Sequence, residues 1–436
     1  MSGYLTHSIS STGNRKIFTI SAWVKINGTT TNQSIFGTGT AGSNSGKFYF
    51  AISSGAVRIG GGANVYLVTN RLLRDASSWY HLVCAVDTSQ ATSSNRIKFY
   101  INGVQETSFS TSTYPSQDQN TPVNESGKIN TFGAEQGGGE SWDGSMTHMV
   151  LVDGTQLTPS NFGETDSTTG EWKPKADPTG VTYGTNGVFM KCENSGNFGL
   201  DSSGQGNNYT SNSFPTGAHA KDSASNNYAT WNPLVIRSFQ YPMTLSEGNL
   251  KVIADANSSY GSTVAATVSL GKGKWYWEFK YTTSGTGGYV VGWGEDTYNF
   301  NYQADAYPYK ASLGSTSGVF YRADGGKVVN GTETASAGAA WSQNDIIGVA
   351  ADLDNGNITF YKNGTSQFSE TSVFTSTLFY YPEFYGYSSK GGQANFGNPS
   401  FSIASGNADA NGHGNFEYSV PSGYFALCTK NINAYG

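Results

Sequence analysis

Cysteine, charge and long apolar runs are all scarce in this sequence. Its three cysteines, Cys84, Cys192 and Cys428, lie far apart and form no CxxC pair, so they predict neither a disulfide framework nor a zinc site. No window approaches the roughly 18 consecutive apolar residues of a membrane-spanning helix. The first residues, Met1 to His7, lack a basic segment followed by an apolar stretch. We therefore expect no secretion signal and no membrane insertion.

Charged residues make up only 13% of the chain, about half the usual share, and the net charge is −6. No run of lysine or arginine could neutralise successive phosphates. Nucleic acid is therefore not an expected partner.

Glycine and aromatic residues are abundant instead. The 436 residues include 56 glycines and 14% aromatics. Disordered chains are poor in aromatics and rich in charge, so this composition favours turn-rich β-structure. The length allows two or three domains, each with a core of its own.

One short phrase occurs twice, at Ile97–Val104 (Ile-Lys-Phe-Tyr-Ile-Asn-Gly-Val) and at Ile358–Thr365 (Ile-Thr-Phe-Tyr-Lys-Asn-Gly-Thr). In each copy apolar residues alternate, which is the period of a strand with one buried face, and an Asn-Gly pair that suits a tight hairpin turn follows. The repetition predicts one antiparallel architecture used twice. We therefore expect an all-β protein made of two tandem antiparallel jelly-roll sandwiches.

Strand signals recur at short intervals in two stretches of the chain. They predict a sandwich over residues 1–164, a Gly/Ser/Asn-rich connector with short strands over 165–235, a second sandwich over 236–402 and a C-terminal extension over 403–436. A brief helix is expected at Thr158-Pro159, where an N-cap residue precedes a first-turn proline. The apolar segment Tyr418–Cys428 is expected to dock as an extra strand or to contact a neighbouring subunit.

Alternation assigns the faces of two strands. In Phe18–Lys25 the apolar residues share one face, and Trp23 falls on the opposite, polar face. In Trp275–Tyr281 four aromatic residues share one face, which predicts a half-buried strand.

Four segments of the first region carry a family resemblance, namely Phe18–Lys25, Trp79–Val83, Phe99–Gly103 and Trp142–Val150. On these segments the first region resembles laminin-G-like (concanavalin A-like) domains. The second region resembles SPRY domains, and there the carriers are Gly273–Glu278, Val291–Gly294, Ile347–Gly356, Ile358–Gly364 and Asn395–Gly397.

The succession of these regions is similar to structural proteins of tailed bacteriophages. Three further segments take part in that resemblance, namely Asp201–Asn207, Asn226–Leu234 and Pro421–Cys428. The resemblance implies a virion protein, assembled in the host cytoplasm, whose partners are other virion proteins and further copies of the same chain. Fold alone would imply no function.

Glu140 and Asp143 are the nearest candidates for a catalytic pair. Jelly-roll glycoside hydrolases need two carboxylates that face each other across a groove. The spacing of three between these residues differs from the alternating carboxylates along one strand in retaining hydrolases of this fold. We therefore expect no catalytic residues and no enzyme.

No cofactor is expected, and calcium is the alternative left open. Asp352–Asn357 gathers oxygen ligands, but it does not fill the required positions of a helix–loop–helix calcium loop, and a hairpin turn at Asn355-Gly356 explains it better. Laminin-G-like domains often bind calcium at a rim of the sandwich, and Asp87 and Asp143 are placed near such rims.

Seven aromatic residues are the candidates for binding a glycan or a protein, because sugars stack on exposed rings and protein interfaces are rich in aromatics. They are Trp23, Trp142, Trp293, Tyr298, Tyr302, Tyr307 and Tyr309. Both ligand classes are left open at this point.

The sequence thus predicts a non-enzymatic virion structural protein, a surface-exposed fibre or capsid decoration that assembles through protein contacts, with host surface polysaccharide as a further candidate partner. A tail or capsid component with no host ligand and a polysaccharide-degrading enzyme are the alternatives.

Overall fold

The computed structural model describes residues 3–27, 32–40, 46–136, 138–167, 169–215, 218–236, 242–256, 261–285, 289–295 and 318–436. The chain divides into two compact units, which we call unit 1 (residues 1–219) and unit 2 (residues 220–436). The segment that the sequence assigns to a connector is thereby shared between the units, and most of it belongs to unit 1. Among the described residues, no helix is long and apolar enough to cross a membrane.

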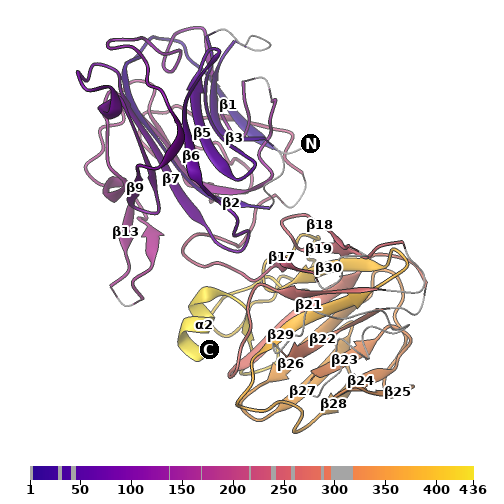
Figure 1. Ribbon diagram of the computed structural model, residues 1–436. Coiled ribbons are helices and arrows are strands. Elements are labelled where there is room, and N and C mark those ends of the chain that lie inside the picture. The colour runs from indigo at the N-terminus through magenta and orange to yellow at the C-terminus, as the bar shows by residue number, and fades with distance from the viewer. Residues whose placement is uncertain are drawn as a thin grey trace. The chain divides into compact units, whose positions relative to one another are not determined.

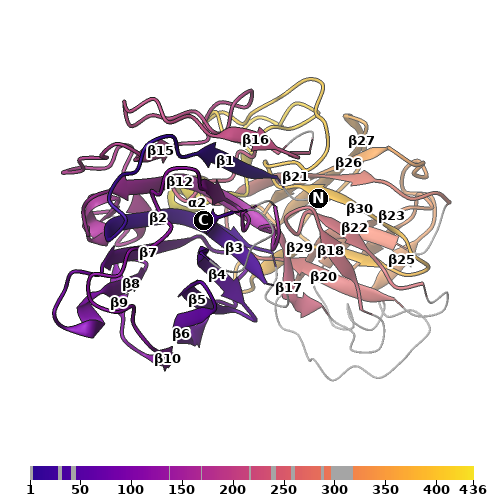
Figure 2. The same ribbon diagram turned by 90° about the horizontal axis from the view of Figure 1, so that it is seen from above.

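Unit 1 is a sandwich of two antiparallel sheets (Figure 1). The first sheet has the order β10 (Phe109–Ser112), β6 (Asn64–Leu72), β5 (Ala56–Gly61), β4 (Phe48–Ser53), β3 (Gln33–Gly39), β11 (Ile129–Phe132), β1 (Tyr4–Ser8) and β16 (Thr210–Asn212). The second has the order β15 (Val188–Met190), β12 (Gly144–Asp153), β2 (Ile17–Ile26), β7 (Tyr80–Asp87), β8 (Ile97–Ile101) and β9 (Val104–Glu106). Figure 2 shows β3, β4, β5 and β6 side by side.

The core of unit 1 lies between these sheets, and alternation along the strands places its residues. In β2, Phe18, Ile20, Ala22 and Val24 belong to the core, as the sequence predicts. Their neighbours along the strand, including Trp23, therefore lie on the outer face of the second sheet.

A further layer covers that outer face. Phe162 and Phe189 pack on Val83, Ala85 and other residues that point away from the core. The predicted short helix is a 3₁₀ turn at Pro159–Asn161, with Thr158 as its N-cap. The hairpin of β13 (Gly163–Thr165) and β14 (Trp172–Pro174) follows it. The central strands β2 and β7 are thus buried on both faces.

Unit 2 repeats the sandwich. One sheet has the order β17 (Trp231–Ile236), β20 (Ser262–Ala266), β29 (Tyr380–Gly386), β22 (Tyr289–Glu295), β23 (Gly318–Arg322), β24 (Lys327–Val329) and β25 (Thr332–Thr334). The other has the order β18 (Thr244–Ser246), β19 (Lys251–Ile253), β30 (Gly391–Asn395), β21 (Lys274–Tyr281), β26 (Ile346–Asp352), β27 (Asn357–Lys362) and β28 (Thr365–Glu370), with β31 (Phe425–Ala426) beside β21. Trp275, Trp277, Phe279 and Tyr281 of β21 all point into the core, as predicted. The expectation of a half-buried strand is wrong, because Tyr276 and Glu278 on the other face are buried as well.

The C-terminal segment covers the outer face of β21 and β26. Phe416, Ala426 and Cys428 pack there on Tyr276 and Ala350. β31 forms the expected extra strand, which is parallel to β21 and only two residues long, and α2 (Thr429–Tyr435) follows. The segment also pairs with the start of unit 2, where the Ala229 amide donates to the Leu427 carbonyl at 2.9 Å.

The repeated Asn-Gly phrase forms the same turn in both units. Asn102 and Gly103 join β8 to β9 with φ of 48° and 81°, and Asn363 and Gly364 join β27 to β28 with φ of 49° and 76°. Positive φ at both central residues is the hairpin geometry that Asn-Gly favours. Each asparagine side chain also caps a neighbouring strand, accepting from the His81 amide at 2.7 Å in unit 1 and from the Ile346 amide at 2.9 Å in unit 2.

Candidate functional site

Three of the predicted ligand-binding aromatics are buried, so the expectation that they offer exposed rings is wrong. The exposed fractions are 2% for Trp23, 4% for Trp142 and 0% for Trp293. Trp142 belongs to the core of unit 1 and Trp293 to the core of unit 2. The other four candidates, Tyr298, Tyr302, Tyr307 and Tyr309, lie outside the described residues.

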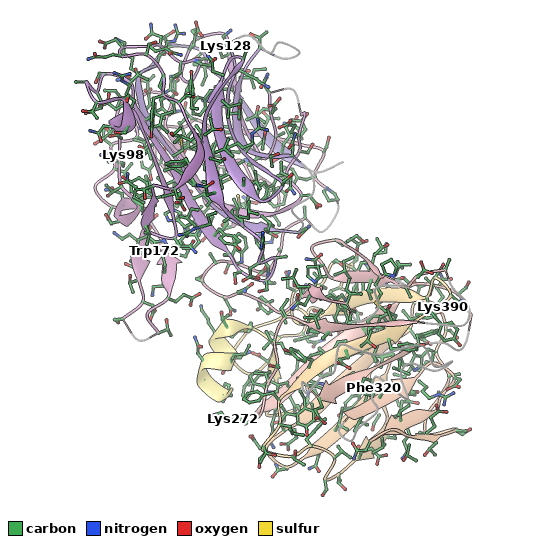
Figure 3. The ribbon with its side chains drawn as sticks, viewed as in Figure 1. Lys98, Lys128, Trp172, Lys272, Phe320 and Lys390 are labelled. Carbon is green, nitrogen blue, oxygen red and sulfur yellow. The ribbon has the colours of Figure 1, made fainter. Side chains whose placement is uncertain are left out.

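Trp23 is buried although it lies on the face that the sequence assigns to it. Its ring stacks on His81, with 4.7 Å between ring centroids and 9° between planes. Trp172, the first residue of β14 (labelled in Figure 3), also stacks on His81, with 6.0 Å between ring centroids, and donates its indole N–H to His81 Nδ1 at 3.0 Å. A distant segment thus covers this face.

His81 holds this group together as a neutral side chain. Burial, with a smaller contribution from His148, lowers the pKa of His81 to about 3. Because Nδ1 accepts from Trp172, the ring proton is on Nε2, which donates to Ser21 Oγ at 2.8 Å. Trp23 and His81 are thus closed to solvent, at 2% and 0% exposure, and offer no ring face to a ligand.

The carboxylates considered for calcium have protein partners. The Asp87 carboxylate accepts hydrogen bonds from the side chains of Ser89 and Gln90, and the Asp143 carboxylate accepts one from the side-chain amide of Asn27 at 3.0 Å. In the described part of the chain, no three His, Cys, Asp or Glu side chains gather in a group that could hold a metal ion. The expectation about calcium stays a prediction.

A cavity of about 300 Å³ opens in unit 1 on the outer face of the first sheet. Its polar lining consists of Asn32, Lys47, Tyr49, Ser53, Arg58, Glu135 and Glu140. Ala51, Ile52, Ala63 and Val65 are among its apolar lining residues. This volume is at the small end of ligand pockets, which typically combine an apolar lining with a few convergent polar groups.

Strand alternation builds the floor of the cavity. Phe48 and Phe50 of β4 point into the core, so Tyr49 between them points outward. Arg58 of β5 points outward for the same reason. Gly60 lies directly opposite Tyr49, and a Cβ atom there would come within 2.2 Å of the Tyr49 hydroxyl. Only glycine at this position leaves room for the ring across the sheet.

The loop between β11 and β12 forms one wall. It lies so close to β3 that a Cβ on Gly37 would come within 2.9 Å of Glu135 Cα. Glu135 pairs with Lys47 at 3.0 Å, and both side chains are largely buried. Glu140 is fixed through its carbonyl, which accepts from the Ser34 amide at 2.8 Å, while its carboxylate accepts from Asn32 at 3.3 Å.

Tyr49 is the centre of this arrangement. The Lys47 ammonium lies 5.4 Å from its ring centroid and the Arg58 guanidinium carbon 5.9 Å. Burial raises the pKa of Tyr49, and the two cations only partly oppose that effect. The phenol therefore stays protonated at neutral pH and offers both a donor and an acceptor.

Of these residues, only Glu140 was a sequence-based candidate, and it was one for catalysis. Tyr49 and Arg58 carried a signal that could have found them, because each is a polar residue flanked by core residues in a strand. Lys47 and Glu135 carried no such signal, because they are far apart in sequence. The loop that holds Glu135 meets Gly37 of β3 only in the folded protein.

Two family models match parts of the chain. Residues 2–161 match the one described as the concanavalin A-like lectin/glucanases superfamily, and residues 274–399 match the SPRY domain. The comparison with curated proteins gives no match.

Solved structures are similar to parts of the chain at low identity. The SPRY domain of human HERC1 has 20% identity and a TM-score of 0.30, over 38% of this chain and 94% of that one. A human SPRY domain has 16% identity and a TM-score of 0.28, over 37% and 97%. A candidate carbohydrate-binding protein from Bacteroides ovatus has 16% identity and a TM-score of 0.35, over 49% and 56%. On the family matches, the chain contains a laminin-G-like (concanavalin A-like) domain followed by a SPRY domain.

Proposed function

We propose that this chain is a non-enzymatic binding protein whose unit 1 cavity holds a saccharide, and that it works on the outside of a tailed-phage virion as a fibre or capsid decoration. The cavity around Tyr49 carries the proposal of binding. Its carboxylates, Glu135 and Glu140, are acceptors for sugar hydroxyls. The Tyr49 hydroxyl and the Arg58 guanidinium are donors for sugar oxygens.

The apolar part of the lining suits the same ligand class. Ala51 and Val65 offer small apolar surface beside the polar groups, and a sugar ring presents C–H groups between its hydroxyls. Binding sites that combine the two orient a small polar ligand through a few fixed hydrogen bonds.

A variant that fills the cavity tests binding. Ala63 is exposed in a turn at the rim, so Ala63→Trp narrows the cavity without disturbing the core. Ala91, also exposed in unit 1 but outside the lining, supplies the control Ala91→Trp. On an array of bacterial surface polysaccharides, we expect wild type and Ala91→Trp to bind the same glycan and Ala63→Trp to lose it. Equal binding by all three proteins would contradict the proposal, as would no binding by wild type.

The virion context is supported by the resemblance of Asp201–Asn207, Asn226–Leu234 and Pro421–Cys428 to segments of phage structural proteins. Immunogold labelling of intact particles with antibodies against unit 2 tests it. Label on tail tips, projecting fibres or the capsid surface is expected, and unlabelled particles would contradict it.

One observation favours a second candidate function, a polysaccharide-degrading enzyme. Glu135 and Glu140 line the same cavity, and glycoside hydrolysis needs two carboxylates. Both, however, lie in a loop rather than along one strand, and Glu135 is held by Lys47. Release of reducing ends from a bound glycan by wild type, and its loss in Glu135→Gln and Glu140→Gln, would favour the enzyme.

A further inference from the structure

Among the described residues, Arg58 is the cation of the cavity that lacks a protein anion. Lys47 pairs with Glu135 at 3.0 Å, and Glu140 accepts from Asn32 at 3.3 Å. Within the described ranges, the Arg58 side chain forms no hydrogen bond or ion pair. It makes a cation–π contact with Tyr49, with 5.9 Å between its guanidinium carbon and the ring centroid.

An arginine in this position keeps its charge, because its guanidinium does not lose a proton in proteins. Its planar fork matches a carboxylate in two parallel hydrogen bonds, which a lysine ammonium cannot provide. The strand fixes the face from which this side chain leaves the sheet, because Val57 and Ile59 on either side are held in the core. Arg58 thus lines the cavity, where a carboxylate brought by a ligand would find its donors.

The other charges around Arg58 restrict the ligand further. The Lys47–Glu135 pair is neutral as a unit, and the Glu140 carboxylate repels a second anionic group. The site therefore suits a ligand with one anionic group for Arg58 and uncharged donors for the two glutamates. A saccharide with one carboxylate per ring and several hydroxyls has both, because its hydroxyls can donate to Glu135 and Glu140 while its carboxylate binds Arg58. Densely sulfated chains do not suit this site.

We propose that the ligand of the unit 1 cavity is an acidic saccharide of the uronic acid type, bound through its carboxylate to Arg58. This inference rests on the proposed function, since it names the ligand class of the same cavity.

Calorimetric titration of the full chain with matched probes tests it. The probes are oligosaccharides of polygalacturonate, alginate and hyaluronan, together with their carboxyl-reduced forms. The variants are Arg58→Gln, which removes the charge, and Arg58→Lys, which keeps the charge but loses the fork. Arg74→Gln, at an exposed arginine outside the lining, is the control, and thermal unfolding of every variant verifies its fold.

We expect wild type and Arg74→Gln to bind at least one acidic probe about tenfold or more tightly than its reduced form, since charge-assisted bonds are worth that much. Arg58→Gln should lose this preference while binding the reduced form within about twofold of wild type, and Arg58→Lys should fall between them.

Three results would overturn the inference, and the first two differ in what they say of the proposed function. Equal binding of acidic and reduced probes by wild type, lost in Ala63→Trp, would overturn the acidic ligand and leave saccharide binding in place. Binding of no probe by wild type would count against both. Retention of the preference by Arg58→Gln would show that another residue recognises the carboxylate.

Discussion

The indole of Trp172 lies against Gly103, so closely that a Cβ atom on the glycine would come within 3.2 Å of the ring. Unit 2 has the same relationship, because a Cβ on Gly364 would come within 2.6 Å of Tyr418 Cδ1. In both units a segment that follows the sandwich thus places an aromatic ring over the glycine of the Asn-Gly turn. The duplicated phrase therefore provides a docking point for the covering layer as well as a turn.

Gly364→Ala should destabilise unit 2 more than a change at a glycine with the same backbone but no neighbour. Gly412 has the same φ of 76° and nothing within 4 Å of a Cβ. Gly412→Ala should cost about 1 kcal/mol, the price of left-handed backbone. Gly364→Ala should cost about 2 to 4 kcal/mol, because Tyr418 must also move. Urea unfolding measures both, and equal losses would mean that the ring contact is weak.

Trp172→Phe should separate the hydrogen bond from the packing of the ring. Loss of the indole N–H leaves buried His81 Nδ1 without its donor, which should cost about 1 to 2 kcal/mol. Trp172→Ala also removes the ring from His81 and Gly103, and should cost about 2 to 4 kcal/mol. The free energy of unfolding at pH 7.5 tests this order. If both variants match wild type, the hairpin does not stabilise unit 1.

Unit 1 should lose stability in acid through His81. Its pKa in the folded state, about 3, lies below the ordinary 6.5 because the ring is buried, so below pH 6.5 the unfolded chain binds a proton that the folded chain does not. The contribution of His81 to stability is complete above pH 6.5 and falls toward pH 3, by about 3 kcal/mol at pH 4.5, two pH units below the ordinary pKa. His148, whose pKa burial lowers to about 4, acts in the same direction. His81→Gln should be less stable at pH 7.5 and should lose less between pH 7.5 and 4.5. The same loss in both proteins would contradict this account.

Unit 2 should respond to pH in the opposite direction through Glu278. Burial raises the pKa of this carboxyl to about 7, although the amides of Glu417 and Tyr418 donate to it and partly oppose the rise. The folded state therefore holds its proton more tightly than the unfolded chain. Stability from this group is complete below pH 4.5 and declines as pH rises toward 7, by an amount on the order of 2 kcal/mol between pH 5 and 8.

Glu278→Gln removes the titration, so the difference in unfolding free energy between wild type and variant should change by that amount between pH 5 and 8. Lys280→Gln, on the same face of β21, is the matched control and should show no such change. A constant difference for Glu278→Gln would show that its four hydrogen bonds compensate for burial completely.

The sequence predicted the sandwiches and strand faces because these follow from local alternation. Phe18–Lys25 and Trp275–Tyr281 show this, since every core residue expected there lies in a core. The exposure of side chains on the outer faces could not be predicted in this way. Trp23 lies on the predicted outer face, yet Trp172 and His81, both distant in sequence, bury it. The cavity was missed for the same reason, because the pairing of Lys47 with Glu135 depends on a loop folding over Gly37.

Side-chain NMR of protein labelled at tyrosine shows whether the cavity around Tyr49 holds the ligand, with the Tyr49 resonance assigned from Tyr49→Phe. On titration with a glycan that wild type binds, we expect the Tyr49 resonance to shift in wild type and to stay in place in Ala63→Trp. A Tyr49 resonance that stays in place in saturated wild type, while other tyrosines shift, would contradict it.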